Sequence, residues 1–395
     1  MKMNTINTKP NQICTRCVMD TTDPDIAFDE NGYCNHCTNA IERLKQPPYG
    51  LPPAEKEKAL NELIQKVKKA GEGKKYDCVI GLSGGVDSTY LAYLVKQWGL
   101  RPIAVHMDNN WNSKEAEHNI SNICKILGFD EKRVVLNWEE FKDLQLAFLK
   151  ASTPDSEIPS DNAIFSALWN TAKKYKIKYI LAGYNQASEN ILPGAWAQGY
   201  FDEIYIKSLH KLFGKLKKIS FHILTTFELF FNYRFYNTKL VSTLDYVFYD
   251  KEKAKQIITN ELDWKDYGRK HGESTYTRIF QEYILPVKFG FDKRKAHLSS
   301  LIAAGQLSRE EAIRQLSVPI YPNEKSIQED INILCQKFEI SIDEFEHIMS
   351  LPIKSINDYP NDSKNIKLRL LKITRNIYKN IKPIFISSSR KNILL

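Results

Sequence analysis

The sequence predicts an α/β protein built on a doubly wound parallel sheet, with a small cysteine-rich region before it and a mainly helical region after it. An apolar run at residues 77–82 leads into Ser83-Gly84-Gly85, and an apolar helical pattern begins directly afterwards. Further apolar runs then alternate with helical patterns, and two CxxC pairs stand near the N-terminus. Strands that alternate with helices are typical of a parallel sheet with helices on both faces.

Length and composition fit such a fold. The chain has 395 residues, of which 43% are hydrophobic and 26% charged, as expected for a globular protein of two or three domains. No apolar run is long enough to span a membrane. The N-terminal residues lack the apolar core of a signal peptide. We therefore expect a cytoplasmic protein.

The formal net charge of +9 is concentrated at the C-terminal end. From Leu351 onward the chain has ten lysines and arginines against two aspartates. Such a run is often a solvated basic helix end. An anionic partner, a membrane surface or a nucleic acid would also attract it.

The cysteine pairs predict a metal site. Cys14 and Cys17 are separated by sixteen residues from Cys34 and Cys37. This spacing is typical of a zinc ion held by four thiolates, and because such a site has no open position, its role would be structural. Disulfides are disfavoured in a cytoplasmic protein, and an iron–sulfur cluster is the lesser alternative. The other cysteines stand in apolar stretches and are expected to be buried: Cys78, Cys124 and Cys335.

The turn after the first strand has the composition of an anion site. Glycines let the backbone approach a ligand closely, and the free N–H groups at the start of the following helix face it. Ser83 and Ser88 add hydroxyl donors. Asp87 would repel a phosphate, so an acid here suggests Mg²⁺ that bridges to a polyphosphate. The turn has no Walker A pattern. A plain strand-to-helix turn is the alternative.

The strand ends that follow are also polar. Strands are predicted at residues 77–82, 102–107, 133–136 and 179–182, with helices at 114–127, 138–149 and 161–175. Ligands of such sheets bind beyond the carboxyl ends of the strands. We therefore expect residues 83–88, 108–110 and 183–189 to surround one cleft, although each polar end is also compatible with a simple turn or cap.

Residues 204–250 change character. Five lysines precede the aromatic segment 221–236, which is too short to span a bilayer: Lys207, Lys211, Lys215, Lys217 and Lys218. We interpret the segment as a buried helical hairpin or a subunit interface, with a peripheral membrane contact as the alternative.

A second polar cluster lies further on. Lys270, His271 and Glu273 stand within the five-residue stretch KHGES, and Lys293 and Arg294 begin another basic turn. Polyphosphate or an anionic substrate would need cations of this kind. A solvated helix face with a glycine turn is the alternative.

These features divide the chain into five predicted regions. They are a zinc ribbon (1–45), a linker and packing helix (46–75), a nucleotide-binding domain (76–205), a helical, aromatic-rich region for substrate or partner (206–330) and a basic helical tail (331–395).

The motifs resemble a known family. SGGVDS at residues 83–88 resembles the PP-loop of the ATP pyrophosphatase superfamily, SGGxDS. In combination with CTRCVMDTTDPDIAFDENGYCNHC, HMDNNW, KHGES and YILPVKFGFDKRKAHLSSLI, it resembles the N-acetyl sugar amidotransferase family of bacterial O-antigen and related surface-sugar biosynthesis. The resemblance extends from Cys14 to about Tyr321. It departs from the family at its GEN-type motif, where Tyr184 replaces the acid and Glu189 follows further on.

The resemblance implies a fold of the PP-loop adenine nucleotide alpha-hydrolase type and an ATP-dependent amidotransferase. Such an enzyme converts an acetamido group of a nucleotide-linked sugar to an acetamidino group through an O-adenylyl intermediate, forming AMP and pyrophosphate. ATP, Mg²⁺ and structural zinc are the implied cofactors. Ammonia would come from a separate glutaminase subunit, with a cyclase-like synthase subunit as a further partner.

The resemblance also implies roles for single residues. ATP would be held by Ser83, Gly84, Gly85, Val86, Asp87, Ser88, Asp108 and Gly183. Asp87 would position Mg²⁺, Lys270 would hold the pyrophosphate, and His271 or Glu273 would take a proton from the ammonium. The weaker candidates for substrate contacts are Asn185, Glu189, Lys293 and Arg294.

Two other functions compete with this one. A PP-loop tRNA-modifying enzyme of the thiolation or lysidine type would share the loop and the zinc ribbon. Sulfur transfer, however, needs a catalytic cysteine near the loop. Cys78 is expected inside a strand and Cys124 inside a helix, so neither is placed for this role. A non-catalytic zinc-ribbon protein that binds RNA would need a basic ribbon. Residues 14–37 carry one cation, Arg16, against five acids. We therefore expect no nucleic-acid partner.

Overall fold

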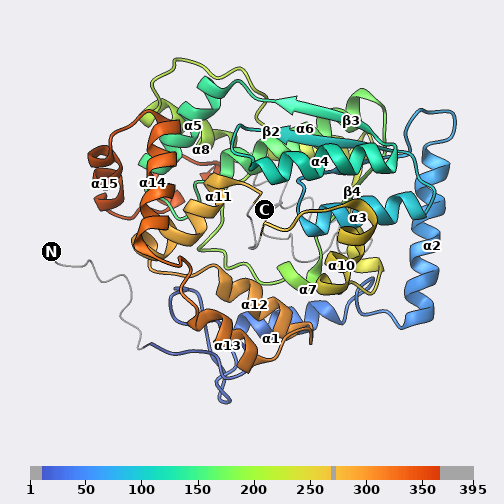
Figure 1. Ribbon diagram of the computed structural model, residues 1–395, viewed down its shortest axis with the longest axis horizontal. Coiled ribbons are helices and arrows are strands. Elements are labelled where there is room, and N and C mark those ends of the chain that lie inside the picture. The colour runs from blue at the N-terminus through green and yellow to red at the C-terminus, as the bar shows by residue number, and fades with distance from the viewer. Residues whose placement is uncertain (1–10, 268–272, 365–395) are drawn as a thin grey trace.

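The centre of the protein is the predicted parallel sheet. The computed structural model describes residues 11–267 and 273–364 (Figure 1). Five strands lie in the order β3-β2-β1-β4-β5, and each neighbouring pair is parallel. Their bounds are β1 Cys78–Gly81, β2 Pro102–Asp108, β3 Asp130–Val135, β4 Tyr179–Ala182 and β5 Lys239–Ser242. Strands β1 and β2 are almost wholly buried, as expected where helices cover both faces.

Helices pack on both faces of the sheet, so the doubly wound α/β fold is confirmed. The first face carries α5 (Trp138–Lys150), α6 (Ile158–Lys174) and α8 (Glu203–Phe213). The second carries α2 (Pro53–Ala70), α3 (Val86–Gln97), α4 (Lys114–Leu127) and α10 (Lys251–Leu262). Because side chains alternate along a strand, Val79 packs in the first core and its neighbour Ile80 in the second.

The sheet has one strand more than the sequence predicts. Strand β5 has the sequence KLVS, and all four of its residues are half-buried, as suits an edge strand. Four residues with one charge give no clear apolar signal. Because β5 lies at residues 239–242, the sheet extends beyond the range 76–205 predicted for the nucleotide-binding domain. Of the predicted helices, α4 begins and ends at the predicted residues.

The aromatic segment 221–236 is not a buried helical hairpin, and this prediction was wrong. In α9 (Thr226–Arg234) only Leu229 is buried. Phe227, Phe231 and Phe235 are 50%, 38% and 63% exposed. Their rings contact one another along one side of the helix. An exposed aromatic surface of this kind suits an interface.

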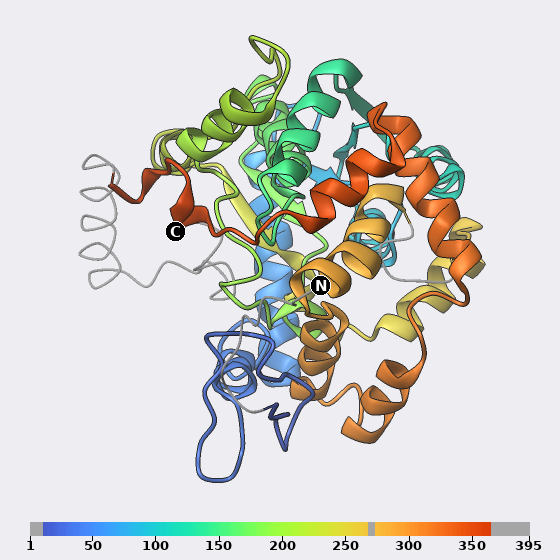
Figure 2. The ribbon, with the colours of Figure 1, turned by 90° about the vertical axis from the view of Figure 1, so that its left-hand side faces the viewer.

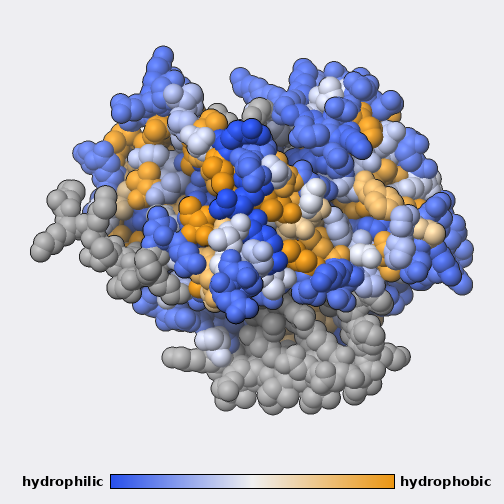
Figure 3. Space-filling model, turned by 90° about the horizontal axis from the view of Figure 1, so that it is seen from below, coloured by the Kyte–Doolittle hydropathy of each residue, from blue (hydrophilic) through white to orange (hydrophobic). Residues whose placement is uncertain are grey.

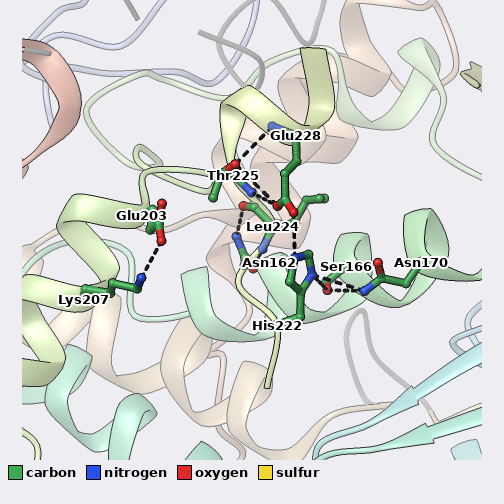
Figure 4. A network of polar contacts seen from close by, with 9 residues as sticks. All are labelled: Asn162, Ser166, Asn170, Glu203, Lys207, His222, Leu224, Thr225 and Glu228. Atoms are coloured by element: carbon green, nitrogen blue, oxygen red, sulfur yellow. Dashed lines mark hydrogen bonds and ion pairs between the residues drawn. The ribbon is translucent and has the colours of Figure 1, made fainter. Parts of the chain in front are cut away.

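Figure 4 shows how this segment is attached to the sheet domain. The His222 ring lies between two helices, with Nδ1 3.0 Å from Ser166 Oγ of α6 and Nε2 2.9 Å from Glu228 Oε1 of α9. Glu228 also accepts a hydrogen bond from the Thr225 N–H and completes a capping box at the start of α9. Ser166 is buried within α6, so this Ser–His–Glu line is a structural link and not an exposed nucleophile.

The C-terminal region is mainly helical, as predicted. Its elements are α11 (Thr275–Ile279), the π-helix η2 (Phe280–Phe289), α12 (Arg294–Ala303), α13 (Arg309–Ser317), α14 (Glu324–Phe338) and α15 (Ile342–Ser350). A third core joins this region to the end of β2 and to α5. In it, the rings of Trp111 and Tyr276 lie 5.2 Å apart, and the rings of Trp111 and Phe338 lie 5.4 Å apart.

The cysteine-rich region packs on this helical region and not on the sheet (Figure 2). It ends in α1 (Asn35–Leu44), which contacts α12. Arg309 of α13 donates to the backbone oxygens of Cys14 and Cys17, both at 3.1 Å. The remaining short elements are α7 (Gln186–Glu189), η1 (Thr243–Tyr246), η3 (Ile356–Asp358) and η4 (Asp362–Lys364).

The described part of the chain has no helix that is long and apolar enough to cross a membrane. On the face seen in Figure 3, apolar side chains form separate patches between hydrophilic ones. The last part of the predicted basic tail, residues 365–395, lies outside the described residues.

Candidate functional site

The loop between β1 and α3 has the predicted geometry of an anion site. Gly84 adopts a left-handed backbone with φ +82°, which a residue with a side chain rarely tolerates. Helix α3 begins after Gly85 without a side-chain cap, so its first N–H groups stay available. Ser83 and Ser88 converge, with their Oγ atoms 3.1 Å apart. The loop therefore presents backbone and hydroxyl donors together.

A cleft of about 1260 Å³ opens beside this loop. Of the single residues predicted for the site, six line it: Ser83, Ser88, Glu189, Glu273, Lys293 and Arg294. Asn109, Tyr184 and Ser188 also line it, within the segments 108–110 and 183–189 that were predicted to surround the cleft. Other residues of its wall were not predicted, among them Glu157, Ser160, Asp161, Arg278, Gln281 and His297. The cleft lies at the carboxyl ends of β1 and β2, where the topology places ligands.

Asp87 lies in the first turn of α3 and is held from outside the loop. Its carboxylate accepts a hydrogen bond from the hydroxyl of Tyr249. Burial, together with the charge of Asp87, raises the pKa of Tyr249 well above its usual value, so this hydroxyl stays protonated and donates. The backbone oxygen of Gly84 accepts from Trp264 Nε1 at 2.7 Å and from the Tyr267 hydroxyl. No sequence motif marks these aromatic supports.

Asp108 forms an ion pair with Arg133. Arg133 Nε donates to its Oδ2 at 3.0 Å, and the N–H of Asn110 donates to its Oδ1 at 2.8 Å. Burial raises the pKa of Asp108, but these hydrogen bonds outweigh it and hold the pKa below its usual value. Its neighbour Asn109 is the residue that lines the cleft, with Nδ2 3.1 Å from Ser160 Oγ. Asp108, which the sequence predicts to contact ATP, is thus in an ion pair with Arg133.

The end of β4 is also close to the loop, but Asn185 is not free for a substrate. Asn185 is buried and caps α7, with its Oδ1 accepting from the N–H of Ser188 at 2.9 Å. Tyr184 and Glu189 line the cleft, and the Tyr184 hydroxyl donates to the Glu189 backbone oxygen at 2.8 Å. Tyr184 therefore packs at the site where the resembling family carries an acid.

Gly183 is in direct contact with the loop, and its replacement by alanine is expected to disturb ATP binding. A Cβ at this position would lie 2.9 Å from the backbone C and O of Asp87 and 3.0 Å from the N of Ser88. Forcing strand and loop apart should cost about 2 kcal/mol of folding stability and weaken ATP binding, measured by thermal melting and calorimetry. Gly194→Ala is the control, because a Cβ there has no atom within 4 Å. Equal behaviour of both variants would contradict this role.

Two of the predicted catalytic residues, Lys270 and His271, lie outside the described residues. Glu273 is described and reaches the loop: its Oε1 lies 3.8 Å from the position that a Cβ on Gly85 would occupy. Its backbone oxygen accepts from the N–H of Ser113 at 2.8 Å, and the N–H of Thr275 donates to the Trp111 oxygen at 2.9 Å. These bonds fix the segment beside the end of β2.

Lys293 and Arg294 differ in their partners. Arg294 forms a close pair with Asp292, Nε to Oδ2 at 2.9 Å and Nη2 to Oδ2 at 2.7 Å, so its charge is largely compensated. Lys293 Nζ lies 3.5 Å from Glu157 Oε2 and is 26% exposed. Sequence reasoning did not single out Glu157, because its loop carries no recognisable motif.

The four clustered cysteines fit a tetrahedral metal site. Their Sγ atoms all lie within 4.8 Å of one another. The Cys14–Cys37 pair is 3.7 Å apart and the Cys17–Cys34 pair 3.6 Å. Tetrahedral zinc with bonds of about 2.3 Å would place neighbouring sulfurs about 3.8 Å apart. All four are buried, so the donor set suits a closed, structural zinc site.

Two family models match separate parts of the chain. Residues 56–192 match NAD synthase, and residues 273–374 match "LPS biosynthesis protein WbpG-like, C-terminal domain". The chain is thus a PP-loop-type nucleotide domain joined to a C-terminal domain of the kind found in lipopolysaccharide biosynthesis. The second match begins at Glu273 and includes Lys293, and both residues line the cleft. Ser83 and Ser88 of the first matched region line it as well, so both regions contribute to one cleft.

Several curated relatives share parts of the chain. An uncharacterised protein of Methanocaldococcus jannaschii is 26% identical over 293 residues, 73% of this chain and 87% of that protein. A tRNA-specific 2-thiouridylase of Fusobacterium nucleatum is 29% identical over 142 residues, 34% of this chain and 39% of its own length. A 7-cyano-7-deazaguanine synthase of Campylobacter jejuni is 42% identical over 72 residues, which are 18% of this chain and 31% of that enzyme. The chain spans less than half the length of these two enzymes.

Two solved structures are similar in part. The NH3-dependent NAD synthetase of Campylobacter jejuni, in complex with nitrate, aligns with 18% identity and a TM-score of 0.27 over 34% of this chain and 58% of that one. The NMN synthetase of Francisella tularensis aligns with 17% identity and a TM-score of 0.31, over 69% of this chain and 99% of that one.

Proposed function

We propose that this protein is an ATP-dependent amidotransferase that converts the acetamido group of a nucleotide-linked sugar to an acetamidino group. One observation carries the proposal. A single cleft is lined by the phosphate-loop serines of the NAD synthase-like region and by residues of the WbpG-like region, among them Glu273 and Lys293. An ATP-activating loop that shares its cleft with a domain of lipopolysaccharide biosynthesis type supports a sugar substrate.

The chemistry explains why ATP is needed. An amide oxygen is a poor leaving group, so ammonia cannot displace it directly. In the proposed reaction, the acetamido oxygen attacks the α-phosphorus of ATP and pyrophosphate leaves, which gives an O-adenylyl imidate. Ammonia then attacks the imidate carbon, the bond between that carbon and the AMP oxygen breaks, and the amidine forms. Positioning and electrostatic stabilisation supply most of the catalysis in such transfers.

The loop residues have the chemistry for the first step. Ser83, Ser88 and the free N–H groups of α3 would hold the phosphates. Asp87 would hold Mg²⁺, which when bound compensates phosphate charge. Lys270 remains our proposal for the pyrophosphate contact, outside the described residues.

Partners follow from the chemistry of ammonia supply. We propose a separate glutaminase subunit, with a cyclase-like subunit beside it. The seven cysteines are all buried, and four of them form the metal cluster, which supports the absence of a glutaminase nucleophile in this chain. The exposed aromatic side of α9 supports a partner contact or a peripheral membrane contact.

A tRNA thiolation enzyme is the second candidate, favoured by the similarity to a tRNA-specific 2-thiouridylase. Sulfur transfer needs a reactive thiolate. Burial raises the pKa of Cys124 to about 12 and raises that of Cys78 further. These cysteines therefore stay as unreactive thiols, which favours the sugar reaction.

The test is an assay of the purified protein with ATP, Mg²⁺, ammonium chloride and a panel of UDP-linked acetamido sugars. We expect AMP, pyrophosphate and a sugar product whose mass differs by the exchange of O for NH. Glutamine is expected to replace ammonium only when a glutaminase is added. Formation of AMP with tRNA, and with none of the sugars, would overturn the proposal in favour of tRNA modification.

A further inference from the structure

Helix α9 has one buried side and one exposed aromatic side. Leu229 is its buried residue, and it packs in the core on the first face of the sheet. Because a helix turns about 100° per residue, Phe227 and Phe231 lie on the side opposite Leu229, with Phe235 close to them. All three rings are exposed. A contiguous exposed apolar patch of this kind marks a surface that binds a protein or a membrane.

The rings of the aromatic side cover one another. The ring centroids of Phe227 and Phe231 are 4.6 Å apart, and those of Phe231 and Phe235 are 4.9 Å apart with the rings stacked. A nucleobase needs an open ring face on which to stack, and the neighbouring rings take up the faces of Phe231. The aromatic side therefore offers ring edges and apolar volume, which suit an acyl chain better than a base.

A basic segment lies beside the end of α9. Residues 173–178 have the sequence KKYKIK, with four exposed lysines and no acid. The N–H of Lys239 donates to the backbone oxygen of Lys178 at 2.8 Å, which holds this segment next to the residues that follow α9. Lys173 Nζ lies 5.8 Å from the ring centroid of Tyr236, which is 54% exposed. Cations thus border the aromatic side.

Acids are scarce on α9. The helix carries one, Glu228, which accepts from the N–H of Thr225 and pairs with His222 at 2.9 Å. Arg234 adds a cation to the same helix, and its guanidinium carbon lies 5.7 Å from the ring centroid of Phe235. The surface therefore combines exposed aromatic rings with positive charge.

The end of the described chain lies near the same helix. The N–H of Asp362, in η4, donates to Asp202 Oδ2 at the start of α8, at 2.8 Å. The backbone oxygen of the adjacent Phe201 accepts from the N–H of Thr226, the first residue of α9, at 3.2 Å. Figure 2 shows the red end of the described chain on the same side of the molecule as the yellow-green segment with α9. Residues 365–395 follow, with eight lysines and arginines and no acid.

We propose that the aromatic side of α9 and the lysines of residues 173–178 bind an anionic membrane surface, so that this protein is a peripheral membrane protein. Phenylalanine and leucine on one side, with lysine and arginine beside them, is the combination that holds a helix at a membrane interface. The cations are attracted to anionic headgroups, and the rings enter the boundary between headgroups and acyl chains. The basic residues 365–395 add to the same attraction.

Charge argues against other occupants of this surface. A second copy of the chain would bring the same cations to the contact, and the basic residues 365–395 would be repelled by the lysines. An acidic protein would match the charge, but lysine is depleted in protein interfaces. An anionic membrane matches both the rings and the charge.

The test is flotation of the full-length protein with vesicles of phosphatidylcholine alone and of phosphatidylcholine mixed with phosphatidylglycerol. We expect binding to the mixed vesicles that salt weakens, because exposed charges are screened. Phe227→Ser with Phe231→Ser should lower the affinity for the mixed vesicles at least about tenfold, since both rings lose their apolar contact. Lys173→Gln with Lys174→Gln should lower it about 30-fold, since two attractive charges are lost.

The control variants lie on α2, which covers the other face of the sheet. Phe248 is 71% exposed, and its ring centroid lies 5.1 Å from Lys56 Nζ of α2. Lys58 and Lys69 are exposed lysines of α2. Phe248→Ser, and Lys58→Gln with Lys69→Gln, should keep the wild-type affinity. Thermal melting checks the fold of every variant, and the lysine pair at 173 and 174 keeps the test valid if the phenylalanine pair does not fold.

Several results would overturn the membrane surface. They are equal binding of the wild type to both kinds of vesicle or to neither, wild-type affinity in the aromatic and the lysine variants, and an equal loss in the α2 controls. Binding of polyuridylate in place of vesicles, lost in the same variants, would assign the surface to RNA. Dimerisation that the phenylalanine pair abolishes, without vesicle binding, would assign it to a second copy. The proposed sugar reaction is independent of these results, because neither the aromatic side nor residues 173–178 line the cleft.

Discussion

Asp87→Asn is expected to lower AMP formation about 1,000-fold or more, since a loss of about 4 kcal/mol in transition-state stabilisation corresponds to that factor. Asp87 stands in the first turn of α3, next to the loop that presents Ser83 and Ser88. It is the acid in this loop and our candidate ligand for Mg²⁺. An amide keeps the side-chain shape but lacks the charge that holds a cation near the phosphates.

The asparagine variant separates catalysis from folding. The buried Tyr249 hydroxyl donates to Asp87, and alanine would leave it without an acceptor, which costs about 1–3 kcal/mol. Asparagine retains an acceptor oxygen. Loss of the negative charge at the start of α3 removes about 0.3–1 kcal/mol of helix-dipole stabilisation. The melting temperature should therefore change little.

The measurements are AMP release with the sugar that the panel identifies, Mg·ATP binding by calorimetry, and thermal melting. Glu115→Gln is the control, because Glu115 is an exposed acid in the first turn of the neighbouring helix α4. It should behave as the wild type. Normal turnover of Asp87→Asn would remove Asp87 from the phosphate site and with it the assignment of the loop.

The parts of the site that the sequence predicts are those encoded locally. A strand, Ser-Gly-Gly and a helix follow one another directly, so Ser83, Gly84 and Ser88 could be placed before the fold was known. The same holds for the CxxC pairs. Chain order also predicts that β1 and β2 end at the same edge, because strand–helix alternation implies a parallel sheet.

The remaining parts depend on contacts between distant segments. The ion pair of Asp108 with Arg133 joins positions on two strands whose register a single sequence does not fix. Tyr249 reaches Asp87, and Lys293 reaches Glu157, only after α10 and α12 have packed. Phe227 and Phe231 looked like core residues because aromatic content alone does not distinguish a core from an exposed interface.

Cys34→Ser is expected to lower the melting temperature strongly, since losing one of four thiolates removes most of the metal's contribution, which is at least about 3 kcal/mol. No helix or strand lies within residues 11–34: the described structure there consists of turns and two isolated bridges, Ile13 with Asp20 and Phe28 with Cys34. A metal that joins all four cysteines would hold these turns together. Metal analysis should find one zinc per chain in the wild type and a reduced content in the variant.

Cys335→Ser is the matched control, because Cys335 is also buried but lies in α14, outside the cluster. It should retain zinc. Unchanged zinc content and melting temperature in Cys34→Ser would contradict the metal site, and iron in place of zinc would keep the four-thiolate site while changing its metal.

The same variant should also impair the cleft before the whole protein unfolds. Arg309 binds the backbone oxygens of Cys14 and Cys17, and Lys295 of α12 pairs with Asp20. Lys293 precedes α12 directly. If the metal holds the ribbon against α12, its removal by a chelator should raise the KM for the sugar at temperatures where the far-UV circular dichroism is unchanged, and added zinc should restore it. A ribbon that is only an independent module would leave the KM unaffected, because nothing would then connect the cysteines to the wall of the cleft.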